Sequence, residues 1–169
     1  MTQVSDPVLG RLERLFSGRV KKSIGDPALW PSAVILLLYP KDGSYCILFN
    51  KRTDTVEFNK GDICFPGGSR DPQDQDLKGT ACREAYEEMG VLPEDVTILG
   101  ELDEDFTRTG FAIHPFVGTI AYPYSFNVSS AEVAEVLEVP LSLLYDDESV
   151  REETWVQPDG QFTRAYVYP

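Results

Sequence analysis

The sequence predicts an α/β fold in which helices pack on a mixed central sheet. Two apolar runs of strand length, 32–40 and 45–52, indicate the sheet, and apolar residues at helical spacing in 7–17 and 77–89 indicate the helices. Because these patterns do not alternate strictly along the chain, we expect a mixed sheet rather than a purely parallel one.

The first part of the chain predicts one helix and a connector. Asp6 is a suitable N-cap for a helix over 7–17, and Pro7 is tolerated in its first turn. The segment SIGDPALWP at 23–31 is rich in glycine and proline, which favours an irregular connector. We therefore expect residues 1–29 to form an N-terminal helix and connector ahead of the sheet.

A hairpin and a glycine-rich turn are expected next. The runs 32–40 and 45–52 flank the turn sequence KDG at 41–43, so they should pair as neighbouring strands. After a polar, irregular segment, DICFPGG at 62–68 predicts a short strand that enters a tight turn, and an acidic loop follows at 69–76.

The second half of the chain continues with mixed elements. Gly90 is expected to end the helix over 77–89 as its C′ residue. Beyond it we expect two strands, a helix, a short helical turn and a hairpin, at 96–104, 111–120, 129–140, 141–146 and around 158–160. The expected helix in this set begins with a run of serine, alanine and glutamate and ends before Pro140.

The composition is that of an ordinary globular domain. Of the 169 residues, 42% are hydrophobic and 25% are charged. No internal repeat, low-complexity tract or linker divides the sequence, so residues 1–169 are expected to form a single domain. The longest apolar run, at 33–39, fits a buried strand and is far shorter than the roughly 20 residues that span a bilayer.

The net charge of −13 restricts the class of partner. Such a surface repels nucleic acid and anionic membranes, so we expect neither as a partner, whereas a homodimer stays open. The three cysteines, Cys46, Cys64 and Cys82, lie singly within apolar patterns, which favours reduced thiols in a cytoplasmic protein over disulfides or a zinc site. The single histidine excludes a histidine-rich metal site.

An acidic face is expected on the helix over 77–89. Glu84, Glu87 and Glu88 share that face, because side chains three and four positions apart are neighbours. Like charges so placed, near the negative end of the helix dipole, weaken a helix by a few tenths of a kcal/mol per pair, and Arg83 offsets part of this cost by pairing with Glu87. Three carboxylates on one rigid face suit a hard divalent cation such as Mg²⁺ or Mn²⁺.

A solvated helix face is the alternative explanation, and it is the common one for acidic runs. The preceding turn favours a metal site instead. CFPGG places two glycines where the backbone must approach another group closely or adopt positive φ. The carbonyl of Gly68 can there supply one more oxygen ligand.

Residues 67–91, GGSRDPQDQDLKGTACREAYEEMGV, resemble the Nudix box, G-x5-E-x7-R-E-U-x-E-E-x-G-U, in which U is aliphatic. The second half of the motif is in register at Arg83, Glu84, Ala85, Glu87, Glu88, Gly90 and Val91. In the first half, Asp74 stands at the glutamate position counted from Gly68, and the gap from there to Arg83 is one residue longer.

Within that family the sequence looks most like the coenzyme A pyrophosphatases. Their FPGG pattern is present, and LFNKRTDTVEFNKGDICFPGG at 48–68 is similar to their upstream motif. Three positions depart from it: Asn50 replaces a threonine, Thr53 replaces serine or alanine, and Glu57 stands where a second arginine is expected. The subfamily usually continues into a final helix where this sequence ends, at Pro169, so either the sequence is short at that end or this member lacks the helix.

The resemblance implies a Nudix α/β/α sandwich and a hydrolase that needs Mg²⁺ or Mn²⁺. The implied metal ligands are Glu84, Glu87, Glu88 and the carbonyl of Gly68. The implied catalytic residues are Glu87, Glu84, Arg83 and Glu132. In this set Arg83 would orient the glutamates, and Glu132 could equally be a helix-start glutamate favoured by the dipole.

Other residues are candidates for substrate contacts. Basic residues that could reach a phosphate are Arg52, Lys51, Arg70 and Lys60, although a surface position explains each of them nearly as well. His114 lies in an apolar strand and is expected to be a core histidine. Aromatic residues that could stack on a base, or pack in the core, are Trp30, Tyr122, Tyr124 and Trp155.

The function predicted is hydrolysis of a pyrophosphate bond in coenzyme A or a related nucleoside diphosphate derivative. Bound divalent cations would resolve the conflict between an acidic chain and an anionic substrate. One alternative is the same chemistry on nucleotide sugars, dinucleotides or nucleoside triphosphates. Another is a non-catalytic nucleotide-binding module of Nudix fold, which would not need three clustered carboxylates. An acidic protein-interaction domain is a third, and it predicts no metal dependence.

Overall fold

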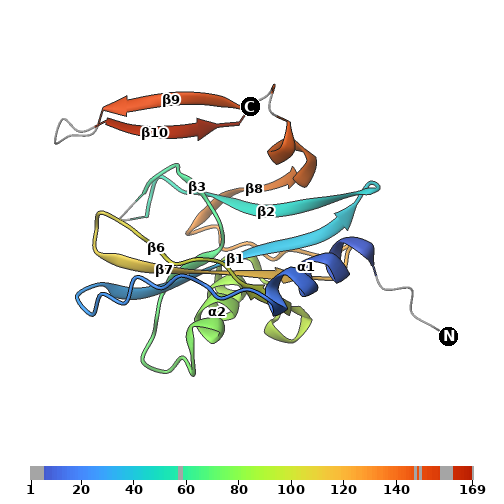
Figure 1. The fold of residues 1–169 in the computed structure, drawn as a ribbon, viewed down its shortest axis with the longest axis horizontal. Coiled ribbons are helices and arrows are strands. Elements are labelled where there is room, and N and C mark those ends of the chain that lie inside the picture. Colours follow the sequence, from blue (N-terminus) through green and yellow to red (C-terminus); the bar gives the residue numbers. More distant parts are fainter. Residues whose placement is uncertain (1–5, 57–58, 147, 149, 157–161, 169) are drawn as a thin grey trace.

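The computed structural model describes residues 6–56, 59–146, 148, 150–156 and 162–168. Five strands of the main eight-stranded sheet follow the order β3-β2-β1-β7-β5, while β4 pairs with β1, β6 with β7 and β8 with β2 (Figure 1). The elements are α1 (Pro7–Ser17), β1 (Trp30–Lys41), β2 (Ser44–Arg52), β3 (Ile63–Cys64), β4 (Gly67–Ser69), α2 (Leu77–Met89), η1 (Pro93–Asp95), β5 (Thr97–Glu101), β6 (Asp105–Phe106), β7 (Phe111–Thr119), β8 (Val133–Pro140), η2 (Leu141–Tyr145), β9 (Arg151–Val156) and β10 (Phe162–Val167).

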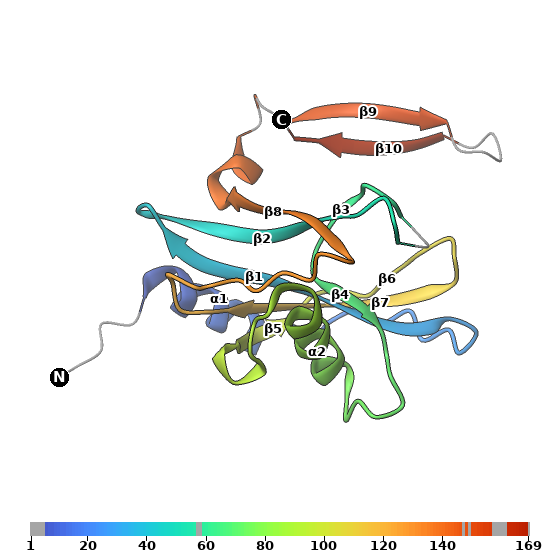
Figure 2. The ribbon, with the colours of Figure 1, turned by 180° about the vertical axis from the view of Figure 1, so that it is seen from behind.

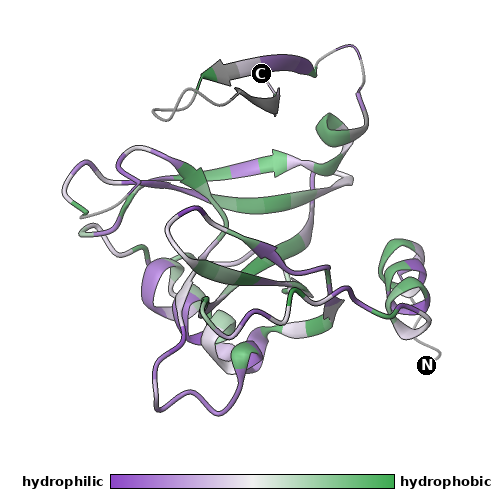
Figure 3. Cartoon of the chain, turned by 60° about the vertical axis from the view of Figure 1, so that its left-hand side comes forward, coloured by the Kyte–Doolittle hydropathy of each residue, from purple (hydrophilic) through white to green (hydrophobic). Residues whose placement is uncertain are grey.

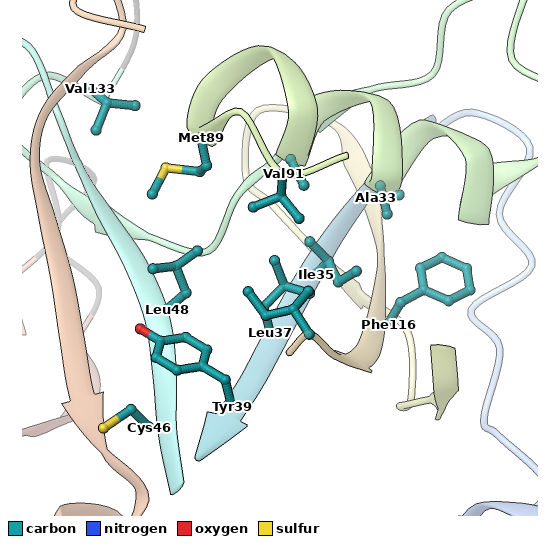
Figure 4. Close-up of a cluster of buried hydrophobic side chains, with 13 residues drawn as sticks. Ala33, Ile35, Leu37, Tyr39, Cys46, Leu48, Met89, Val91, Phe116 and Val133 are labelled. Atoms are coloured by element: carbon teal, nitrogen blue, oxygen red, sulfur yellow. The ribbon is translucent and has the colours of Figure 1, made fainter. Parts of the chain in front are cut away.

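The two α-helices cover opposite faces of the sheet, as Figures 1 and 2 show. Side chains of β1 alternate between the faces, as those of any strand do. One set packs with Ala81, Ala85 and Met89 of α2, and its members on β1 are Ala33, Ile35, Leu37 and Tyr39 (Figure 4). The other set packs with Leu12 and Phe16 of α1, and its members on β1 are Leu36 and Leu38.

The expected α/β sandwich with a mixed sheet is thus confirmed. β1 pairs antiparallel with β2 from Leu38 to Lys41 and parallel with β7 from Trp30 to Leu38. Apolar strands occupy the centre of the molecule, and hydrophilic residues concentrate in the outer loops (Figure 3). Each large apolar side chain buried in this way stabilises the fold by about 1.5–3 kcal/mol.

One edge of β1 is shared by two partners, and this positions the site. β4 pairs with residues Ser32 to Val34, whereas β2 pairs only from Leu38 onward. Between these two pairings, the amide of Ile35 donates to the carbonyl of Pro66 at 2.9 Å. The sheet therefore forks at this point, and the Gly-Gly strand β4 diverges from β2 toward α2.

Local signals fix both ends of α2, and the expected bounds 77–89 are confirmed. The Asp76 carboxylate accepts from the amide of Gly79 at 2.7 Å, which caps the N-terminus. Gly90 has φ of 71° and ends the helix, since its amide donates to the carbonyl of Tyr86 at 2.9 Å. The helix α1 is likewise confirmed, with Asp6 as its N-cap.

The prediction of a helix over 129–140 was wrong. Residues Val133–Pro140 form β8, which pairs antiparallel with β2 from Cys46 to Arg52. Glutamates and valines repeat every three residues here, a spacing that imitates a helix. The β-branched valines favour a strand, and the free edge of β2 needs a partner for its backbone groups.

The predicted strands and the short helical turn in the second half of the chain are confirmed with smaller changes. The strands expected at 96–104 and 111–120 are β5 and β7, and the short helical turn is η2. The glycine turn expected within 62–68 opens directly into strand β4, which sequence patterns did not indicate. β9 and β10 form the final hairpin, whereas its expected PDG turn lies outside the described residues.

No helix in the described part of the chain combines the length and apolarity needed to cross a bilayer.

Candidate functional site

The acidic face of α2 meets the fork of the sheet. Glu88 is the most enclosed of its glutamates, with 2% of the side chain exposed, compared with 15% for Glu84 and 51% for Glu87. The Oε2 atom of Glu88 accepts from Asn50 Nδ2 at 2.8 Å and from the amide of Gly67 at 3.2 Å. Its Oε1 atom lies 3.6 Å from Nη1 of Arg52, so the carboxylate has a different environment on each side.

The two glycines of β4 permit a close approach of backbone to the carboxylates. A Cβ atom added to Gly68 would lie 2.4 Å from Oε1 of Glu84, and one added to Gly67 would lie 2.4 Å from the carbonyl oxygen of Ala33. The carbonyl of Gly68 accepts from Ser32 Oγ at 2.7 Å, and Gly68 is in register with Ala33 of β1. Only glycine fits at either position without displacing a neighbour.

Arg83 connects the acidic helix with the loop that precedes it. Its Nη1 atom lies 3.0 Å from Oε1 of Glu84 and 2.9 Å from Oε2 of Glu87. Its Nη2 atom donates to the carbonyl of Ser69 at 3.0 Å, and the same guanidinium also binds Asp74. The expected role of Arg83 in orienting glutamates is consistent with these contacts, and Asp74 occupies the motif position assigned to it.

Burial and neighbouring negative charges raise the pKa values of two glutamates of this site. Burial raises the pKa of Glu88 to about 7, and the neighbouring carboxylates of Glu84 and Glu132 add to the effect. Burial also raises the pKa of Glu84, against the opposing effect of Arg83. In contrast, hydrogen bonds from Arg83 hold the pKa of Asp74 well below its ordinary value. The positive charge near Glu84 and Glu88 is therefore too small to offset the cost of burying their ionised carboxylates.

Carboxylate oxygens and a glycine carbonyl are the ligands that hard divalent cations take, so this donor set fits Mg²⁺ or Mn²⁺. Within the described part of the chain, the ligand atoms of three acidic, histidine or cysteine side chains all lie within 4.8 Å of one another in one group, which is Glu101, Glu104 and His114 and does not include the glutamates of α2. Lys21 already occupies that group, because its Nζ atom pairs with Glu101 and lies 3.1 Å from Oε1 of Glu104. That group is therefore a weaker candidate for holding a cation than the acidic face of α2.

A cleft of about 670 Å³ opens beside the glycine strand. Arg52, Gly67 and Gly68 line the end next to α2. Apolar side chains make much of the remaining wall, among them Val34, Ile63, Phe65, Phe111 and Ile113. A second hollow of about 660 Å³ is lined by Glu87 itself, together with Tyr86 and Tyr124.

The expected basic contacts divide into two groups. Arg52 lines the cleft and approaches Glu88, whereas Lys51, Lys60 and Arg70 are exposed residues outside the described cleft lining. Arg70 donates instead to the carbonyl of Asp74 at 3.3 Å. Glu57, at the position where an arginine is expected, lies outside the described residues.

Glu132 precedes β8 and is exposed, so its interpretation as a helix-start glutamate was wrong. Its carbonyl accepts from the amide of Thr53 at 2.9 Å, which ties this turn to the end of β2. The charge of Glu132 also raises the pKa of both Glu84 and Glu88, so it lies within electrostatic reach of the acidic face.

The candidates His114, Tyr122 and Tyr124 contact buried or half-buried residues of the protein. His114 Nδ1 is buried and has no hydrogen-bond partner among the described residues, and it lies 3.5 Å from Oε1 of Glu101 and 3.3 Å from Oε1 of Glu104. Tyr122 stacks on Tyr39, and Tyr124 packs at a tilt on Phe126.

Two other predictions concern exposed or undescribed residues. Trp30 is 72% exposed, whereas the side chain of Trp155 lies outside the described residues. Cys46, Cys64 and Cys82 are free thiols, as expected, although Cys64 lines the cleft and Cys82 is half-buried.

Sequence reasoning missed the role of Asn50. In the sequence Asn50 appears only as a departure from the subfamily motif, although a lone asparagine in an apolar strand is itself a signal of a buried polar contact.

The sequence profile of the NUDIX domain family matches residues 29–164. The chain belongs to this family. It is 39% identical to the peroxisomal coenzyme A diphosphatase ndx-8 of Caenorhabditis elegans over 119 residues, which are 68% of this chain and 51% of that protein. It is 38% identical over 122 residues to the uncharacterized Nudix hydrolase NudL of Photorhabdus laumondii subsp. laumondii, covering 72% of this chain and 65% of the relative.

The chain thus spans between about half and two thirds of the length of these two Nudix relatives. The crystal structure of the Nudix hydrolase RenU from M. smegmatis is similar with a TM-score of 0.58 and 22% identity, over 75% of this chain and 81% of that one. This likeness supports the Nudix fold.

Proposed function

We propose that the chain is a divalent-metal-dependent Nudix hydrolase that cleaves the pyrophosphate bond of coenzyme A or a related nucleoside diphosphate derivative. The observation that carries this proposal is the buried carboxylate of Glu88 beside Glu84 and the Gly68 backbone, at the end of a cleft. The coenzyme A diphosphatase named among the relatives supports the choice of substrate.

The ligands proposed are Glu84, Glu87, Glu88 and the Gly68 carbonyl. A divalent cation held there would neutralise the pyrophosphate and lower the pKa of a bound water. Arg83 keeps Glu84 and Glu87 in place through the contacts described above. Mg²⁺ and Mn²⁺ both suit this oxygen donor set, and we propose Mg²⁺ or Mn²⁺ as the cofactor.

The remaining roles follow from position. Arg52 lies at the junction of the cleft and the carboxylates, where its guanidinium can bind a phosphate oxygen. Glu132 is a candidate to accept the proton of the attacking water, because it lies within electrostatic reach of the acidic face. The apolar walls of the cleft suit an uncharged arm of the substrate better than a second phosphate group.

A panel of coenzyme A, nucleotide sugars, dinucleotides and nucleoside triphosphates, each with Mg²⁺ or Mn²⁺ and with products resolved by mass, tests the proposal. We expect coenzyme A to yield phosphopantetheine, and a metal chelator to abolish the reaction. Turnover of another compound without coenzyme A cleavage would replace the substrate and keep the chemistry. Tight nucleotide binding with no turnover of any compound would favour the non-catalytic module.

We also propose a cytoplasmic location and a nucleotide-pyrophosphate small molecule as the partner. The free thiols of Cys46, Cys64 and Cys82 support a reducing compartment. Fractionation of the native host checks the location, and light scattering decides between a monomer and a homodimer.

A further inference from the structure

Asn50 is a polar residue enclosed in the core of the protein. Its side chain is fully buried on β2, in register with Cys64 of the neighbouring strand β3. Burying an amide without hydrogen-bond partners is unfavourable, so the partners of such a group show what it contributes. Leu48, two residues earlier and equally buried, packs in the apolar core instead.

Both ends of the Asn50 amide are engaged. Nδ2 donates to Oε2 of Glu88 at 2.8 Å, and Oδ1 accepts from the thiol of Cys64 at 2.7 Å. The carboxylate of Glu88 can only accept when ionised, and Cys64 supplies a donor at the opposite end. Glu88 and Cys64 together select one orientation of the Asn50 amide, since a flipped amide would point Oδ1 at the Glu88 carboxylate, which is also an acceptor.

This contact determines which oxygen of Glu88 is free to face the site. Oε2 receives two hydrogen bonds, from Asn50 and from the amide of Gly67. Oε1 is left on the side of Arg52, the residue that lines the cleft. The two donors come from different strands, β2 and β4, so they fix the carboxylate across the fork of the sheet.

We infer that Asn50 is a positioning residue, which holds the carboxylate of Glu88 with Oε1 presented to a divalent cation, and that the thiol of Cys64 fixes the orientation of its amide. The inference rests on the proposed function, because Glu88 is a metal ligand only in that proposal. Residues that support a metal ligand in this way typically change metal affinity or activity by about 10–100-fold when they are replaced.

Calorimetric titration of the metal-free full chain with Mn²⁺, without substrate, tests the inference. Asn50→Asp keeps the shape but replaces the donor with an acceptor, and Asn50→Ala removes the amide. We expect each change to raise the Mn²⁺ dissociation constant by about 10-fold or more. Leu48→Val is the matched control, because it alters packing on the same buried strand without touching Glu88, and it should leave the dissociation constant within about twofold.

The thiol is tested by a second pair of variants. Cys64→Ser retains a hydroxyl donor for Oδ1 of Asn50, whereas Cys64→Val removes it. We expect Cys64→Val to weaken Mn²⁺ binding and Cys64→Ser to restore most of the loss. Equal affinities for these two variants would refute the role of the thiol.

These measurements distinguish a failure of the positioning role of Asn50 from a failure of the proposed function. If wild type binds Mn²⁺ and both folded Asn50 variants bind it equally well, the positioning role is refuted while the proposed function stands. If wild type neither binds Mn²⁺ nor hydrolyses any substrate, the proposed function fails, and the inference fails with it. Circular dichroism of each metal-free variant reports folding, and the isosteric Asn50→Asp decides the matter if Asn50→Ala does not fold.

Discussion

Arg83 holds Asp74 through two hydrogen bonds, from Nε to Oδ1 at 2.9 Å and from Nη2 to Oδ2 at 3.1 Å. Oδ2 of Asp74 also accepts from Thr80 Oγ1 and from the amide of Asp71. The aspartate at the motif's glutamate position thus anchors the loop that leads into α2. It also fixes the guanidinium that holds the glutamates.

Asp74→Asn should destabilise the protein by about 1–3 kcal/mol, because an amide cannot accept from both guanidinium nitrogens and its charge is lost. Urea unfolding at pH 7 measures the change. Asp71→Asn is the matched control, since this exposed carboxylate accepts only from the amide of Gln73 among the hydrogen bonds described. An equal loss in both variants would contradict a special role for the pair of Asp74 and Arg83.

Glu87→Gln should reduce turnover at least about 100-fold, because one of the proposed metal ligands loses its charge. Its effect on the free energy of unfolding should stay within about 0.5 kcal/mol, since the exposed pair with Arg83 contributes little and repulsion on α2 is relieved. Steady-state kinetics and urea unfolding report the two quantities. A large loss of stability with intact turnover would argue against the metal site.

Glu88 should make the metal-free protein less stable as the pH rises. Its pKa is about 7 in the folded state, compared with 4.5 ordinarily, so the folded state holds more protons between these values. The unfolding free energy should therefore fall across that window, by on the order of 3 kcal/mol from this group.

Urea unfolding of wild type and Glu88→Gln at pH 5 and pH 8, with a chelator present, isolates this contribution. From pH 5 to pH 8 the unfolding free energy of the wild type should fall relative to that of Glu88→Gln. When Mn²⁺ replaces the chelator at pH 8, the wild type should regain this stability and the variant should not. A difference between the two proteins that does not change with pH would contradict the raised pKa.

The two adjacent glycines should respond differently to alanine. In Gly67→Ala the new Cβ meets backbone atoms of Ala33 and Val34, which cannot move independently, so we expect a loss of about 1–3 kcal/mol or more. In Gly68→Ala the three atoms nearest to the new Cβ all belong to the carboxylate of Glu84, which can rotate away. The second variant should fold normally and bind Mn²⁺ poorly, as thermal unfolding and calorimetry can establish. Normal Mn²⁺ affinity in Gly68→Ala would exclude this cradle from the metal site.

Lys21→Met should lower stability by about 1–3 kcal/mol and leave Mn²⁺ affinity unchanged. Removing the ammonium leaves Glu104, whose side chain is 5% exposed, without its ion pair. Urea unfolding and Mn²⁺ titration test the two parts. A gain in Mn²⁺ affinity in this variant would indicate that the group of Glu101, Glu104 and His114 binds the cation once the ammonium is removed.

The ends of α1 and α2 could be predicted from the sequence because their signals are local. Asp6 and Gly90 act through hydrogen bonds to residues a few positions away. The segment 129–140 could not be predicted in the same way, since its state depends on the open edge of β2, more than 80 residues earlier in the chain. A repeat of glutamate and valine every three residues is compatible with a helix and with a strand, and only the position of that open edge decides between them.

The identity of the acidic residues at the site was also predictable, whereas their environments were not. Glu84, Glu87 and Glu88 share a helix face by spacing alone, yet they differ in exposure from 51% to 2%. That difference arises from β4 and from Asn50, which approach α2 through the tertiary fold. Their proposed roles as ligands stay predictions until a metal is measured.

The parallel pairing of β1 with β7 has a consequence for the order of folding. It joins residues 30–38 to residues 111–119, and β4 and α2 lie within the loop that this pairing closes. Closing so long a loop costs entropy before the contacts form, which slows the search for the native state. During synthesis, the elements that form the fork and carry the glutamates, β1, β2, β4 and α2, all leave the ribosome before β7. The fork can therefore assemble early, whereas the sheet that supports it gains its interior strand β7 only later.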